Sequence, residues 1–264
     1  MTSRYSLPFR DADIVVDAVG DGSVVGYLHG GVGNPGVHPF LTSLAAHDRR
    51  VVAPSLPGFT GSAPCPDIRS LYDWVVVTSE TLDVAGLAGC PVVASSVGAM
   101  LALELAAVRP EAFASLVLIA PFGLWDPGDP TADPFARTLS GQRSILTADA
   151  MATSQFFDDQ PDRAAVDLIE DNVARYSSRT SFASLIWPIP EFGLSTRLHR
   201  VTCPVTLVWG SDDRVIPVSY LERFTNALPN VVGTHVVSGA GHLVEWDAPD
   251  AVAELVVTAP FYDR

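Results

Sequence analysis

Short runs of hydrophobic residues, bounded by glycine, proline or charged residues, recur along the whole 264-residue chain. They cover residues 13–19, 23–30, 50–54, 90–95, 115–120, 204–210 and 231–237. Uninterrupted runs rich in Val, Ile and Leu are typical of strands that a sheet buries on both faces. The first two runs are joined by Gly-Asp-Gly at 20–22, which predicts an antiparallel hairpin at one edge of the sheet.

Segments with helical spacing of hydrophobic residues separate most of the later runs. They cover residues 70–87, 97–108, 218–228 and 248–258. The first opens with Ser70-Leu-Tyr-Asp, a capping-box pattern, and Pro110 ends the second. The alternation of strands and helices predicts an α/β fold with a mostly parallel sheet flanked by helices.

Residues 122–200 break this alternation. They contain no convincing strand, and the spacing predicts helices near 148–158, 163–176 and 181–187, with several prolines as breaks. A segment of this length inside a compact α/β unit is too long for a passive connection. We therefore expect one core, residues 1–121 and 201–264, with a helical lid inserted between two strands at 122–200.

Composition excludes several classes of partner. Acidic residues outnumber basic ones by 30 to 16, for a net charge of −14, and no basic patch offsets the repulsion of a nucleic acid. The first residues lack the apolar core of a signal peptide, and no apolar run approaches membrane-spanning length. The sequence predicts a cytoplasmic protein, monomeric or homodimeric, that binds neither membrane nor nucleic acid. Its three cysteines have no paired spacing, so we expect no metal or other cofactor.

The stretch Pro-Val-Val-Ala-Ser-Ser-Val-Gly-Ala-Met at 91–100 places two serines between a predicted strand and a predicted helix. A sharp turn at such a junction projects a nucleophilic serine from the carboxyl edge of a sheet, within the pattern G-x-S-x-G. If Gly98 is the last glycine of that pattern, Ser96 is the nucleophile, and Ala94 stands in the place of the first glycine. The alternative is that both serines are structural residues at a helix N-terminus.

A serine nucleophile needs a base, and the base needs an orienting acid. His242 lies in a glycine-rich loop after the last predicted strand, and Asp212 and Asp213 end the strand before it. The order Ser, Asp, His is the one found in hydrolases with a nucleophile elbow. Spacing alone leaves both aspartates as candidates.

The sequence Leu-His-Gly-Gly at 28–31 ends an early strand. An oxyanion is stabilised by preorganised amides, one after the nucleophile and one from such a loop. These would be the amides of Val97 and Gly31, with Gly30 as the alternative in the loop. A phosphate-binding loop is the other interpretation, but the glycine spacing of known phosphate motifs is missing.

Five motifs in order resemble the α/β-hydrolase superfamily: "LHGG", "PSLPGFTGSA", "ASSVGA", "WGSDDRVIP" and "GAGHLVEWDAP". The resemblance spans nearly the whole chain and implies an α/β-hydrolase fold with Asp213 as the acid and Asp212 as its solvated neighbour. The chain departs from the family at Ala94 and Ala99, where glycines are usual.

The resemblance implies a cofactor-independent serine hydrolase that forms an acyl-enzyme on Ser96. Hydrolysis of a small, largely apolar carboxylic ester is the leading expectation. The alternatives are C–C bond hydrolysis of a vinylogous diketone, and a binding or lyase role without hydrolysis. The C–C hydrolases that the chain resembles commonly have a tryptophan where Leu243 stands, and their lid arginine has no confident match here.

Substrate specificity is expected to reside in the lid. The candidate substrate-binding residues are Gly30, Phe122, Met151, Phe156, Phe157, Trp187 and Leu243. An apolar pocket for an aromatic or alicyclic acyl group could be formed by Phe122, Phe135, Met151, Phe156, Phe157 and Trp187, although such residues more often pack a lid onto its core. Among the histidines outside the triad, His29 is expected to support its loop by hydrogen bonding, and the others to be surface residues or satisfied structural ones.

Overall fold

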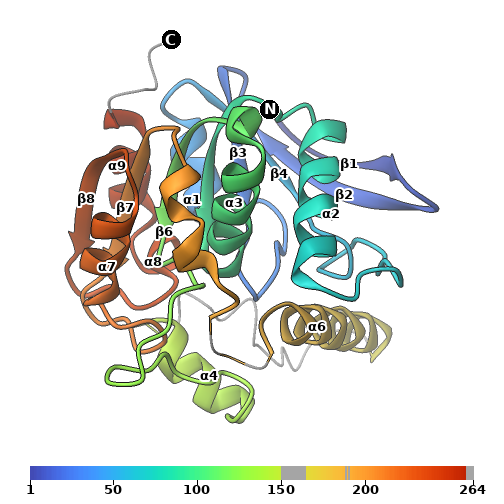
Figure 1. Cartoon of the computed structure of the whole chain (residues 1–264). Helices are drawn as coiled ribbons and strands as arrows, with labels where there is room; N and C mark the ends of the chain where they lie inside the picture. The colour runs from blue at the N-terminus through green and yellow to red at the C-terminus, as the bar shows by residue number, and fades with distance from the viewer. Residues whose placement is uncertain (150–164, 188, 190, 260–264) are drawn as a thin grey trace.

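The structure is a computed structural model that describes residues 1–149, 165–187, 189 and 191–259. In this part of the chain eight strands form one sheet, in the order β1-β2-β4-β3-β5-β6-β7-β8 (Figure 1). The strands are β1 (Thr2–Phe9), β2 (Ala12–Val19), β3 (Ser23–Leu28), β4 (Arg49–Pro54), β5 (Cys90–Ser95), β6 (Phe113–Ile119), β7 (Val205–Gly210) and β8 (Val231–Val237). All neighbouring pairs from β4 to β8 are parallel, and β2 is antiparallel to both β1 and β4. The mostly parallel sheet is therefore confirmed.

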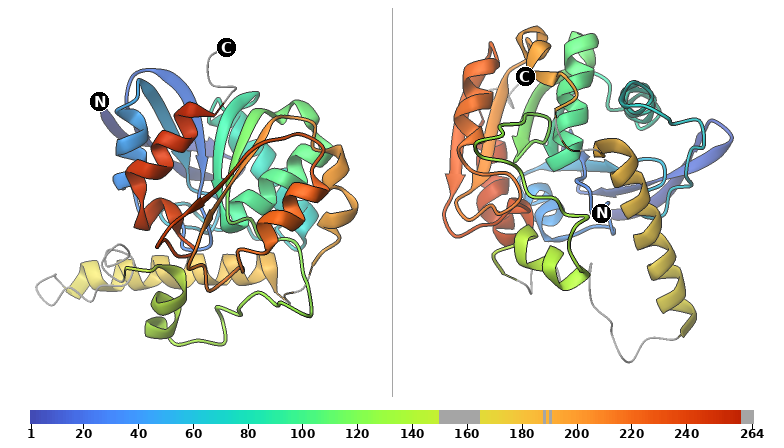
Figure 2. Two further views of the ribbon diagram at one scale, coloured as in Figure 1. Left: turned by 90° about the vertical axis from the view of Figure 1, so that its left-hand side faces the viewer. Right: turned by 60° about the horizontal axis from the view of Figure 1, so that its bottom comes forward.

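Helices cover both faces of this sheet (Figures 1 and 2). They are α1 (Pro39–Ala45), α2 (Leu71–Val84), α3 (Ser96–Val108), α4 (Leu139–Leu146), α6 (Ala165–Ile186), α7 (Tyr220–Ala227), α8 (Val244–Asp247) and α9 (Pro249–Thr258). One hydrophobic core joins α2, α3 and α7 to the sheet, and a second joins α1 and α9 to its other face. The central strands of the sheet are thus buried on both sides, as their uninterrupted apolar runs require.

The predicted hairpin at 13–30 is wrong. β2 does not pair with β3, because β4 lies between them, and the hairpin partner of β2 is β1. β1 is an edge strand whose residues are mostly exposed or half-buried, so its sequence alternates and carries no continuous apolar run. A search for apolar runs therefore overlooks it.

The predicted cap of α2 is confirmed. The Ser70 hydroxyl accepts a hydrogen bond from the Asp73 amide at 3.2 Å, while the Asp73 carboxylate accepts one from the Arg69 amide at 3.0 Å. The helix ends at Val84, before the predicted end, because Gly86 turns the chain with a φ of +72°.

Between β6 and β7 the described residues contain α4 and α6 and no strand. The helices expected at 163–176 and 181–187 are one helix, α6, while most of the one expected at 148–158 lies outside the described residues. α6 packs on the loops that follow β3 and β4, through contacts with Gly31 and Gly58. Figure 2 shows its N-terminal half extending away from the rest of the molecule.

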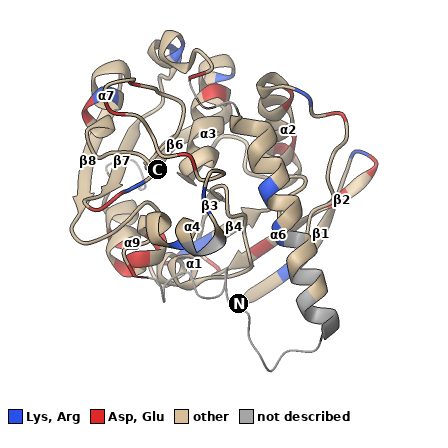
Figure 3. Ribbon diagram, turned by 90° about the horizontal axis from the view of Figure 1, so that it is seen from below, with Lys and Arg blue, Asp and Glu red and all other residues tan. Residues whose placement is uncertain are grey.

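Charged residues are scattered over the elements (Figure 3), and the described residues show no continuous basic stripe on the face that carries α4 and α6. None of the described helices combines the length and the apolarity that crossing a membrane requires.

Candidate active site

Ser96 occupies the turn between β5 and α3. Its φ of +55° is in the left-handed region, which a residue other than glycine adopts only where the surrounding structure enforces it. A Cβ atom on Gly98 would overlap the His29 carbonyl oxygen, so a glycine is needed there for α3 to approach β3 this closely. Ser95 is the N-cap residue, but its side chain makes no capping hydrogen bond, contrary to the structural alternative for the pair.

Three side chains form a hydrogen-bonded relay at this turn. The Ser96 Oγ lies 2.9 Å from Nε2 of His242, and the His242 Nδ1 lies 2.9 Å from Oδ2 of Asp213. The His242 and Asp213 side chains are buried, with 1% and 0% of their surface exposed. An ionised carboxylate at Asp213 accepts a proton only from Nδ1–H, which leaves Nε2 free to accept the serine proton.

Asp213 is held by the turn that follows β7. Its second oxygen, Oδ1, accepts hydrogen bonds from the amides of Val215 and Ile216 at 2.8 and 2.9 Å. Asp212 is exposed, and its carboxylate accepts a hydrogen bond at 3.3 Å from its neighbour Ser211. The structure therefore brings Asp213 to His242 and leaves Asp212 in solvent.

The fold brings the acid and the histidine together because they follow adjacent parallel strands, β7 and β8. Their loops lie in direct contact: a Cβ atom on Gly210 would overlap the carbonyl oxygens of Ala240 and Gly241. Gly210 thus lets the loop that carries His242 lie against the end of β7.

His29 supports the loop after β3, as expected. Its Nδ1 donates to the Gly30 carbonyl at 2.8 Å, and its Nε2 accepts from the Leu56 amide at 3.1 Å. Burial lowers the pKa of His29 to about 4, which keeps the ring neutral and able to accept at Nε2. His38 departs from expectation: it is buried, and neither of its ring nitrogens has a hydrogen-bond partner among the described residues.

The candidate substrate-binding residues are only partly brought together. Phe122 is buried with its ring centroid 5.8 Å from that of His242, edge to face. Leu243 is buried in the core, where its amide donates to the Leu146 carbonyl. Trp187 is 56% exposed at the end of α6. Met151, Phe156 and Phe157 lie outside the described residues.

Gly30 and Gly31 adjoin the serine, as predicted for the oxyanion loop. A Cβ atom on Gly30 would lie 3.1 Å from the Ser96 Cβ. A Cβ atom on Gly31 would lie 2.8 Å from the Phe182 ring. The oxyanion roles of Gly31 and Val97 stay predictions. Phe182, which covers Gly31, was not among the sequence candidates, because only the docking of α6 brings it here.

A second residue that the sequence did not suggest is Glu245, three positions after His242. It is fully buried, and its Oε1 accepts a hydrogen bond from the Tyr27 hydroxyl at 3.1 Å. Burial raises the pKa of this carboxyl group above its usual value. The sequence shows only a glutamate within Val-Glu-Trp-Asp at 244–247, and its burial is visible only in the structure.

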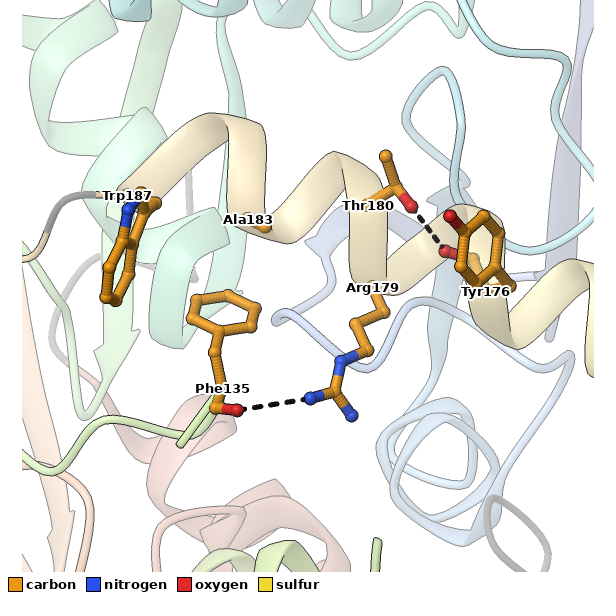
Figure 4. A pocket seen from close by; sticks show the side chains of 6 residues that line it. All are labelled: Phe135, Tyr176, Arg179, Thr180, Ala183 and Trp187. Carbon is orange, nitrogen blue, oxygen red and sulfur yellow. Dashed lines mark hydrogen bonds between the residues drawn. The ribbon is translucent and has the colours of Figure 1, made fainter. Parts of the chain in front are cut away.

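A cavity of about 320 Å³ lies against the outer face of α6 (Figure 4). Its lining residues are Phe135, Tyr176, Arg179, Thr180, Ala183 and Trp187. The Arg179 guanidinium points across it and donates to the Phe135 carbonyl at 3.4 Å. The lining of the cavity combines the aromatic rings with the Arg179 guanidinium and Thr180, and Tyr176 and Trp187 are largely exposed, so the cavity is open to solvent.

The sheet order, the strand-turn-helix at Ser96 and the sequence of the relay define an α/β-hydrolase fold. The profile of the alpha/beta hydrolase family matches residues 27–255, and the chain belongs to this family. Among similar proteins is the 2-hydroxy-6-oxononadienedioate/2-hydroxy-6-oxononatrienedioate hydrolase 2 of Pseudomonas putida, with 27% identity over 94% of this chain and 91% of that protein. The 2-hydroxy-6-oxo-6-phenylhexa-2,4-dienoate hydrolase of Burkholderia cepacia is 25% identical over 97% of this chain and 91% of its own.

Solved structures agree on the fold. The 2-hydroxy-6-oxo-6-phenylhexa-2,4-dienoate hydrolase of a Rhodococcus species superimposes with a TM-score of 0.70 and 22% identity, over 97% of this chain and 98% of that chain. The family and its hydrolase-named relatives identify the protein as a hydrolase.

Proposed function

We propose that the protein is a serine hydrolase in which Ser96 is the nucleophile, His242 the general base and Asp213 the orienting acid. The observation that carries this proposal is the buried relay of two 2.9 Å hydrogen bonds at a strained strand-to-helix turn. A serine hydroxyl is a weak nucleophile by itself, and the relay supplies the base that it needs.

In the proposed cycle, Ser96 Oγ attacks a carbonyl carbon while its proton passes to Nε2 of His242. The Asp213 carboxylate, bonded to Nδ1, stabilises the imidazolium, and the amides of Gly31 and Val97 stabilise the oxyanion. The imidazolium then gives the proton to the leaving group. One water molecule, activated by the same base, releases the acyl group from Ser96 as a carboxylic acid.

For the substrate we propose a vinylogous diketone, in which water cleaves the C–C bond beside a ketone carbonyl to give a carboxylic acid and an enol. The names of the relatives favour this class over the ester expected from sequence, because they are hydrolases of 2-hydroxy-6-oxo dienoates. Ester hydrolysis is the second candidate. It is favoured by the residue after His242, a leucine buried in the core where the C–C hydrolases commonly have a tryptophan.

We further propose that residues 122–200 form the lid of this site. The support is the packing of α6 on the loops that follow β3 and β4, next to Ser96. A lid in this place would exclude water while the carbonyl reacts.

The first test is intact-mass analysis after incubation with a small fluorophosphonate, on the wild type and on Ser96→Ala in parallel. We expect one adduct on the wild type and none on the variant. Absence of an adduct on a folded wild-type sample would contradict the nucleophile assignment and favour a binding role.

The second test compares kcat/KM for 2-hydroxy-6-oxo-6-phenylhexa-2,4-dienoate with kcat/KM for p-nitrophenyl esters. We expect the dienoate to be preferred and its turnover to fall more than about a thousandfold in Ser96→Ala. Preference for the esters would favour the second candidate instead.

A further inference from the structure

The inner face of α6 is built to lie close to the glycine-containing loops around the nucleophile. The Ser177 hydroxyl donates to the Gly58 carbonyl at 2.7 Å, and a Cβ atom on Gly58 would overlap the Ser181 hydroxyl. The Ser178 hydroxyl lies 3.4 Å from that of Thr60. Small serines facing a glycine allow the helix and the loops to approach closely.

Phe182 follows on the same face and lies directly over Gly31. Three of its ring carbons are 2.8 to 2.9 Å from the position that a Cβ atom on Gly31 would occupy, and they are the three atoms nearest to that position. Real Cβ atoms essentially never show such distances. Gly31 has no left-handed φ, and the atoms nearest to a methyl group added there would be those of the Phe182 ring, which would have to shift.

Aromatic contacts connect this ring to the proposed base. The ring centroid of Phe182 lies 6.3 Å from that of Phe122, which in turn lies 5.8 Å from that of His242. On its other side, Phe182 lies 5.0 Å from Phe135, a residue that lines the outer cavity. Phe182 is therefore placed between that cavity and the site of Ser96.

The nucleophile and the base are closed off in this arrangement, since Ser96 is 3% and His242 1% exposed. A substrate carbonyl must reach Ser96 on the side where the oxyanion loop lies, and the Phe182 ring covers Gly31 in this loop. A group attached to the reacting carbon therefore has to pass this ring or displace it.

We propose that Phe182 is a specificity-determining residue. Its ring covers the oxyanion loop and thereby limits the size of the group that can be attached to the carbon that Ser96 attacks. Flat conjugated groups, which can slide along an aromatic face, are admitted more readily than branched ones. This inference rests on the proposed role of Ser96 as the nucleophile.

The test measures second-order labelling rates of Ser96 with two fluorophosphonates, one carrying a small ethoxy group and one a branched bulky group. In Phe182→Ala we expect the ratio of the bulky to the small rate to rise about tenfold or more, and in Phe182→Leu by an intermediate factor. Tyr176→Ala, on the exposed outer face of the same helix, is the matched control and should leave the ratio unchanged.

Gly31 supplies a second readout that needs no substrate. Gly31→Ala should lower the midpoint of thermal unfolding in the wild-type background and lower it much less in the Phe182→Ala background, because the obstructing ring is then gone. Labelling by the small reagent should show the same rescue. The amide of residue 31 is kept in both variants.

An unchanged ratio in Phe182→Ala, with Ser96 still labelled, would overturn the role of Phe182 and leave the proposed function intact. No labelling of the wild type or of any variant would overturn both. Equal effects of Gly31→Ala in the two backgrounds would show that Phe182 does not cover the loop in solution, and the specificity proposal would fail with it.

Discussion

Replacing His38 should make the protein more resistant to acid. The His38 ring stacks on Trp246 at 4.2 Å between centroids and meets Tyr27 edge to face at 5.4 Å. Its ring nitrogens are buried without hydrogen-bond partners among the described residues. Because no hydrogen bond within the described part of the chain offsets the loss of water around the ring, burial disfavours its charged form and lowers the pKa of His38 to about 3.

The effect of pH on stability depends on how readily His38 binds a proton in the folded protein and in the unfolded chain. In the unfolded chain a histidine titrates near a pKa of about 6.5. As the pH falls below that value, the unfolded chain binds a proton that the folded protein excludes, so stability present at high pH is lost in acid. With a folded pKa of about 3, the loss attributable to His38 between pH 8 and pH 4.5 is about 3 kcal/mol.

The variant His38→Phe keeps a flat ring against Trp246 and removes the titration. Urea unfolding at a series of pH values from 8 to 4.5 gives the free energy of unfolding of both proteins. We expect the advantage of the variant to widen by about 3 kcal/mol toward acid. His29, whose pKa is also lowered, is present in both proteins and cancels in the difference. The variant His47→Gln, at an exposed position, is the control.

A difference between His38→Phe and the wild type that stays constant from pH 8 to pH 4.5 would refute this reasoning. It would mean that the folded protein accepts a proton on His38 as readily as the unfolded chain does. Water or a rearranged Glu245 carboxylate would then have to reach the ring.

Three further predictions concern single contacts. Asp213→Asn should lower kcat about a thousandfold through loss of histidine orientation, while Asp212→Asn, at an exposed carboxylate, should stay within about threefold; steady-state kinetics of both variants decide whether the acid is assigned correctly. Gly98→Ala places a methyl group on the backbone of Leu28 and His29, so the midpoint of thermal unfolding should fall by about 5 °C, and an unchanged midpoint would contradict the close packing of α3 on β3. Arg197 donates to both oxygens of the buried Glu104 carboxylate at 2.8 and 2.6 Å. Arg197→Leu should therefore cost about 3 kcal/mol in urea unfolding, and adding Glu104→Gln should recover most of it; additive effects would argue against a coupled pair.

Strands buried on both faces could be read from the sequence, because burial leaves a continuous apolar run. All seven predicted runs are strands, and only their ends differ by a few residues; β8, at the other edge of the sheet, was found through its valines although alternate residues of it are exposed. β1 could not be found in the same way, since its exposed positions carry mostly polar residues and leave no continuous apolar run. The false hairpin has a different origin: the run at 50–54 was found, but no local pattern shows that β4 lies between β2 and β3.

The relay was predictable for a different reason. In a parallel sheet, residues that follow neighbouring strands meet at one edge, so chain order alone brings Asp213 and His242 together. Local spacing could not separate Asp213 from Asp212. The choice depends on which carboxylate is turned toward the Val215 and Ile216 amides, and that is a property of the turn.

The contact between Phe182 and Gly31 could be predicted neither from a local sequence pattern nor from the order of the motifs along the chain. In the sequence, Gly31 is one of two glycines in a loop, and its lack of a side chain is explained equally by backbone flexibility or by room for a substrate. The structure gives a third explanation, because an aromatic ring from a helix about 150 residues away occupies the place of the missing Cβ atom. A contact between α6 and a core loop is fixed only when the two segments dock, and a substitution on either side can change it without altering the three residues of the relay. Substrate choice can therefore diverge among relatives of this fold without a change in those residues.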